Sequence, residues 1–87
     1  MSKFEIMSFV RIINDYFEKN NFRFYATVED GGVGIRYLSD KKIDYRPLFK
    51  YYSYATILRL NDVIIEHFLN NLGLEIKLDI LTEVTNE

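Results

Sequence analysis

The sequence predicts a small α+β domain with two layers, in which a mixed sheet packs against helices on one face. Three observations predict it: two amphipathic helical stripes, two alternating runs joined by glycines, and a third alternating run near the C-terminus. With 87 residues the chain is too short for two hydrophobic cores, and a content of 48% hydrophobic and 16% aromatic residues is enough for one. We therefore expect residues 1–87 to form a single compact domain with the order α-β-β-(α or β)-α-β.

The first predicted element is an amphipathic helix over residues 4–19. Its apolar residues recur at spacings of three and four and form one broad stripe. They are Ile6, Phe9, Val10, Ile13, Tyr16 and Phe17. Ser2 is the expected N-cap, with Glu5 completing a capping box, and Asn20-Asn21 tolerates the left-handed turn that ends a helix.

Two alternating runs, 22–29 and 33–39, predict a β-hairpin. In the first run Phe22, Phe24, Ala26 and Val28 share one face. Asp30-Gly31-Gly32 separates the runs, and glycine permits the positive φ angles of a tight turn.

The segment 40–60 is compatible with two structures. Residues 40–42 are expected to form a polar loop. A helix capped by Asp44 would tolerate Pro47 in its first turn. A strand over 51–58 is the alternative, because Tyr, Thr and Ile favour a pleated surface.

A second helix is predicted from the N-cap Asn61 to about Asn71, with Gly73 as the residue just after its end. The last strand is predicted over 74–80, where apolar and charged residues alternate. Residues 82–87 are expected to be a frayed tail.

The residue types needed for most catalysis and metal binding are missing or badly spaced. The chain has no cysteine and one histidine, His67, which has no second metal ligand at helical spacing. The Gly31–Gly34 run lies between two strands rather than before a helix, so it does not suit a phosphate loop. We expect no catalytic residue, metal or cofactor, and therefore no enzyme.

A basic, aromatic segment at 41–59 is the most informative feature for function. It carries a net charge of +4, whereas the rest of the chain sums to −6. Such a pattern suits a protein interface, nucleic-acid contact, or a core rim covered by long cations. The predicted partner-binding residues are Arg46, Phe49, Lys50, Tyr51, Tyr52, Tyr54 and Arg59. A lesser feature is Ile12, an apolar residue on the polar side of the first helix.

These observations favour a small non-catalytic module that occludes a surface of a larger protein with an acidic surface. Phage counter-defence proteins and toxin immunity proteins are of this type. A small nucleic-acid-binding domain using residues 41–59 is the alternative, although the sequence pI near 5.4 opposes it. Without a long apolar run or a signal-peptide core, we expect a cytoplasmic protein without membrane contact. The abundance of Phe, Tyr, Ile, Asn and Lys over Gly, Ala, Arg and Pro suggests a phage or low-GC bacterium.

Overall fold

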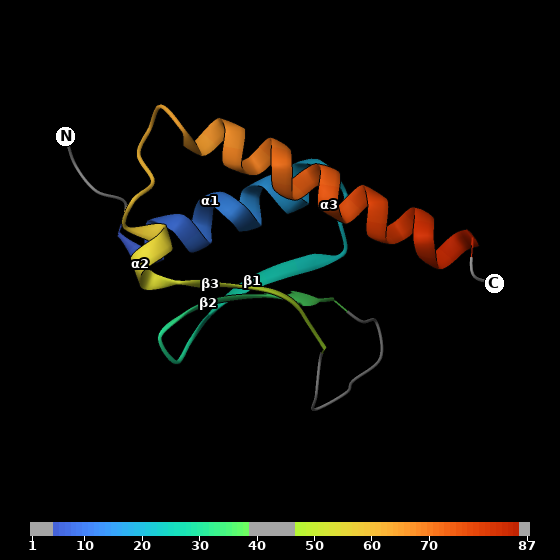
Figure 1. The fold of residues 1–87 in the computed structure, drawn as a ribbon, viewed down its shortest axis with the longest axis horizontal. Coiled ribbons are helices and arrows are strands. Elements are labelled where there is room, and N and C mark those ends of the chain that lie inside the picture. The colour runs from blue at the N-terminus through green and yellow to red at the C-terminus, as the bar shows by residue number, and fades with distance from the viewer. Residues whose placement is uncertain (1–4, 39–46, 86–87) are drawn as a thin grey trace.

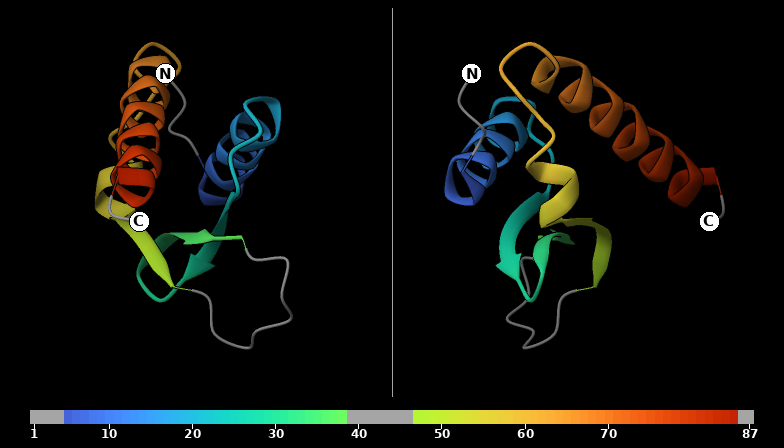
Figure 2. Two further views of the ribbon diagram at one scale, coloured as in Figure 1. Left: turned by 90° about the vertical axis from the view of Figure 1, so that its right-hand side faces the viewer. Right: turned by 60° about the vertical axis from the view of Figure 1, so that its left-hand side comes forward.

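The computed structural model describes residues 5–38 and 47–85 and shows a two-layer α+β domain. In chain order the elements are α1 (Ile6–Lys19), β1 (Phe24–Glu29), β2 (Gly32–Tyr37), β3 (Leu48–Ser53), α2 (Tyr54–Ile57) and α3 (Ile65–Thr85). The strands form one antiparallel sheet in the order β1-β2-β3. Helices α1 and α3 lie side by side on one face of this sheet, and within residues 5–38 and 47–85 no helix covers the other face (Figures 1 and 2). The predicted α+β class is confirmed.

Helix α1 buries the stripe that its sequence predicts. Phe9, Ile13 and Phe17 are fully buried against the sheet, and the remaining apolar residues of the stripe pack around them. The expected cap Ser2 lies outside the described residues. The helix ends at Lys19, and Asn21 takes the left-handed conformation with a φ of 56°, as its short polar side chain allows.

The predicted hairpin is confirmed in β1 and β2. Phe24 pairs with Tyr37 at one end and Glu29 pairs with Gly32 at the other. Gly31 occupies the turn with a φ of +78°, a conformation that few other residues adopt.

The segment after the hairpin contains both of the predicted alternatives in shortened form. β3 pairs with β2, and Phe49 is an extra residue that forms a bulge between Lys50 and Leu48. The chain then turns directly into α2, whose first turn is capped by the Ser53 hydroxyl accepting from the Thr56 N–H at 3.3 Å. Neither one long helix nor a strand over 51–58 describes this region, and Asp44 lies outside the described residues.

The predicted C-terminal strand over 74–80 is wrong, because α3 continues through it to Thr85. The Asn61 side chain accepts from the backbone N–H of Val63 at 2.8 Å, so it caps a turn that leads into the helix at Ile65. Gly73 does not end the helix. Its missing Cβ leaves room for the Tyr16 hydroxyl of α1, which a side chain at this position would overlap. The third strand of the sheet is therefore β3, and the sheet is antiparallel rather than mixed.

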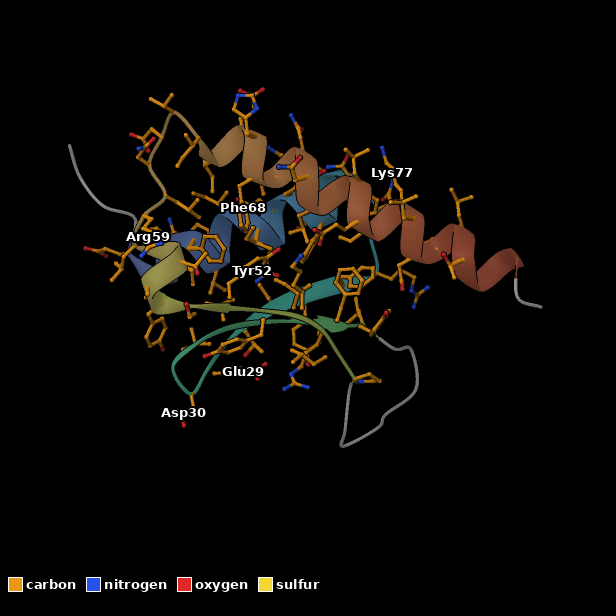
Figure 3. The ribbon with its side chains drawn as sticks, viewed as in Figure 1. Glu29, Asp30, Tyr52, Arg59, Phe68 and Lys77 are labelled. Atoms are coloured by element: carbon orange, nitrogen blue, oxygen red, sulfur yellow. The ribbon has the colours of Figure 1, made fainter. Side chains whose placement is uncertain are left out.

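An aromatic cluster joins α1, the sheet and α3. The ring of Tyr52 in β3 lies 6.2 Å from that of Phe9 and 4.9 Å from that of Phe68, between centroids. Figure 3 shows Tyr52 and Phe68 pointing toward one another between the two layers. Leu72 and Ile76 extend the buried face of α3 along the helix. Apolar packing of this kind is the main force that holds α3 on the sheet.

The Asn14 side chain forms hydrogen bonds with the backbone of the edge strand β1. Asn14 of α1 accepts from the Ala26 N–H at 2.7 Å and donates to the Ala26 carbonyl oxygen at 3.2 Å. The amide therefore pairs with β1 as a neighbouring strand would. Such a contact protects an edge strand from pairing with another chain.

Candidate functional site

A row of three exposed leucines runs along the outer face of α3, and we call it the leucine stripe. Leu74, Leu78 and Leu81 are 59%, 63% and 60% exposed. Their spacing of four and three residues places them on one side of the helix. Three exposed leucines on one side of a helix are close enough to be buried together by one partner, as at an interaction site, whereas single scattered apolar residues are ordinary on a surface.

The opposite face of α3 fixes the stripe in place. Leu72 and Ile76 are buried, and Gly73 allows Tyr16 to approach the helix closely. Lys50 of β3 forms an ion pair with Glu75, with Nζ 2.6 Å from Oε2. These contacts hold the middle of α3 against the rest of the domain, and the helix itself sets the spacing of the leucines before any partner binds.

Sequence reasoning missed the stripe because it assigned these residues to a strand. Leu74 and Leu78 both fit a period of two, and the alternating charges between them strengthened that interpretation. The signal that could have found the stripe is the continuation to Leu81, which breaks the alternation and fits the helical period.

The predicted partner-binding residues do not form one surface. Strand alternation places Tyr51 on the face opposite Lys50 and Tyr52, and the bulge at Phe49 lets that ring share the helix side with them. Phe49 packs on the helix side against Phe24, with ring centroids 5.0 Å apart, and Tyr52 joins the aromatic cluster. Arg46 lies outside the described residues.

Lys50 and Tyr52 lie together on the helix side, near Glu75. The Lys50 ammonium is 5.8 Å from the centroid of the Tyr52 ring, which is within the range of a cation–π contact. Burial, and then the negative charge of Glu75, raise the pKa of Tyr52, so its hydroxyl is neutral. These contacts connect β3 to α3.

Tyr51 lies on the open face of the sheet, which none of the described helices covers. Its hydroxyl donates to the Asp30 carbonyl oxygen at 2.9 Å, and its ring passes over Gly32. On the same face Arg36 binds Glu29 through two hydrogen bonds of 2.6 and 2.7 Å. The Arg36 guanidinium holds the pKa of Glu29 below its ordinary value.

The last two predicted residues lie at the end of the sheet that leads into α2. Tyr54 is half-buried, and its hydroxyl is 3.3 Å from the Glu29 carbonyl oxygen to which it donates. Arg59 is exposed just after α2 and points away from the body of the protein (Figure 3). The basic, aromatic segment thus contributes to the core, the open sheet face and the α2 end.

Neither of the remaining sequence candidates is part of a reactive cluster. His67 is exposed on α3, and Ile12 is half-buried beside Leu69 in a shallow groove between α1 and α3. Over residues 5–38 and 47–85, no three His, Cys, Asp or Glu side chains gather in a way that could hold a metal ion.

None of the helices in the described part of the chain is both long enough and apolar enough to span a membrane. No protein-family model, curated protein or solved structure matches the chain.

Proposed function

We propose that the chain is a small non-catalytic protein-binding module that occludes a surface of a larger partner, and that the leucine stripe is its main contact. The observation that carries the proposal is the 59–63% exposure of three leucines on a helix already anchored by its other face. A helix that presents apolar residues at this spacing suits a hydrophobic groove on the partner.

Charge next to the stripe indicates the chemistry of the partner. Lys77 is exposed, three residues after Leu74 and four before Leu81, and lies on the side of α3 that faces away from the sheet (Figure 3). A groove with an acidic rim would complement this ammonium, in keeping with the acidic partner surface expected from the sequence.

The alternative of nucleic-acid binding has less support. Base stacking needs several aromatic rings on one accessible surface. Phe49 and Tyr52 contribute instead to the core, and of the described residues in the segment only Tyr51 presents an aromatic ring on the open sheet face.

Capture of the partner by a tagged chain, with and without nuclease, tests the proposal. Leu78→Gln should weaken binding by about 1–2 kcal/mol, which is roughly 5- to 30-fold, because a mostly exposed leucine gains about this much on burial. Glutamine is a good helix former, so the fold should tolerate it.

Val63→Gln is the matched control, since Val63 is 76% exposed and lies outside the stripe. It should bind as the parent does. Unchanged binding by Leu78→Gln would remove the stripe from consideration. Capture that is lost with nuclease would favour the nucleic-acid alternative, and loss with Tyr51→Ser would move the contact to the open sheet face.

A further inference from the structure

A pocket of about 370 Å³ lies where the C-terminal half of α3 passes over the start of β1 and the end of β2. This volume is within the range of small-ligand sites, which is about 300–1,000 Å³. The leucine stripe is on another face of α3 and does not contribute to it. The pocket is lined by Asn21, Arg23, Phe24, Tyr37, Leu38, Asp79 and Ile80.

The pocket has an aromatic wall and an exposed apolar rim. The rings of Phe24 and Tyr37 are 4.9 Å apart and tilted by 40°. Two residues that line the pocket, Leu38 just after β2 and Ile80 of α3, are 43% and 42% exposed. A hydrocarbon group in the pocket would cover these exposed side chains, which is favourable.

Asp79 supplies a charged group that is already held in position. The Tyr37 hydroxyl donates to Asp79 Oδ2 at 3.0 Å, which fixes the carboxylate against the aromatic wall. Among the described residues, Tyr37 is the one hydrogen-bond partner of the Asp79 side chain, so Oδ1 remains able to accept from a ligand. A carboxylate accepts several hydrogen bonds, and its strongest partners are cations.

We propose that this pocket binds a small amphipathic ammonium compound, with the ammonium on Asp79 and the hydrocarbon body against Phe24, Tyr37, Leu38 and Ile80. Arg23 carries the opposite charge and makes a further interaction within the protein. A carboxylate ligand is therefore the competing possibility that an experiment must exclude.

Titration of isotope-labelled protein by NMR with two probes of equal hydrocarbon body tests the proposal. Phenethylamine should give saturable shifts at the amides of Phe24, Leu38 and Ile80. We expect a dissociation constant of roughly 1 mM, which is ordinary for a ligand of about nine heavy atoms. 3-Phenylpropionate should bind at least about fivefold more weakly, because Asp79 repels it.

Two variants and a control assign the binding to the pocket. Asp79→Asn keeps an acceptor for Tyr37 but removes the charge, and it should weaken phenethylamine binding about fivefold or more. Ile80→Ala removes part of the rim and should weaken it severalfold, while Glu66→Gln, an exposed acid elsewhere on α3, should have no effect. Tighter binding of 3-phenylpropionate, unchanged binding by Asp79→Asn, or no saturable shift up to 10 mM would each overturn the proposal.

Discussion

The contact between Gly73 and Tyr16 makes a strong prediction about how α3 docks on α1. In an exposed helix, replacing glycine by alanine stabilises the protein by about 1 kcal/mol, because alanine has the higher helix propensity. At Gly73 the added Cβ would overlap the Tyr16 hydroxyl oxygen and lie 3.3 Å from Cζ. Tyr16 packs against Phe17 and Phe22, so its ring cannot turn away without losing contacts.

The magnitude follows from these two opposing effects. Overpacking typically costs about 1–3 kcal/mol. After the gain in helix propensity, Gly73→Ala should destabilise the protein by about 1 kcal/mol. Tyr16→Phe removes the overlapping oxygen, which makes no hydrogen bond within the described part of the chain. In the Tyr16→Phe background, Gly73→Ala should therefore stabilise by up to about 1 kcal/mol, a coupling of about 2 kcal/mol between the two sites.

Urea and thermal unfolding of the four proteins, followed by circular dichroism, measures this coupling. For a domain of this size, 1 kcal/mol corresponds to a shift in melting temperature of about 4–8 °C. Asn70→Ala, at an exposed position on the same helix, reports the propensity gain without the contact. If Gly73→Ala stabilises the parent as much as it stabilises the Tyr16→Phe variant, then Tyr16 does not fix α3 and this reasoning is wrong.

Three further predictions concern the sheet. Because the pKa of Glu29 is lowered in the folded protein, its ion pair with Arg36 stabilises the fold above the ordinary glutamate pKa near 4.5, and this stabilisation is lost as the pH falls. The substitution Glu29→Gln should therefore cost about 1 kcal/mol at pH 7 and less at pH 3, as measured by urea unfolding. Gly32→Ala should cost about 2–3 kcal/mol, because its Cβ would overlap the Tyr52 carbonyl oxygen in the backbone of β3, and a parental melting temperature would contradict this. Asn14→Ala should cost about 1–2 kcal/mol, because the backbone N–H and carbonyl of Ala26 lose their hydrogen-bond partner. Asn14→Asp should not keep full stability, since a carboxylate cannot donate to the Ala26 carbonyl oxygen. Full stability of the aspartate variant in unfolding experiments would refute the pairing.

Local patterns were sufficient for the first helix and the hairpin. The apolar residues of α1 recur at the helical period, and the glycine turn connects two alternating runs as a hairpin. In these segments the residue period, the turn chemistry and the burial all favour the same structure. The capping tendency of Asn61 was likewise predictable, because its side chain bonds to backbone groups only two and three residues away, but it caps a turn and the helix itself begins at Ile65.

Contacts between distant residues decided the C-terminal half. The residues 74–80 fit both a strand and a helix by pattern, and Gly73 resembles a helix end. The helix prevails because Leu72 and Ile76 are buried in the core, because Lys50 pairs with Glu75, and because Tyr16 occupies the space that Gly73 leaves.

The candidate sites, too, depended on contacts between distant residues as well as on local patterns. Composition alone indicated a basic, aromatic segment, but the alternation of β3 and its bulge at Phe49 leave only Tyr51 of the aromatic residues in this strand on the open face. The exposed leucines and the pocket beside Asp79 exist because α3 is one long helix that passes over the sheet. The sequence by itself determines which local structures a segment can form. Packing against distant residues then selects one of them and decides which of its sides is exposed to solvent.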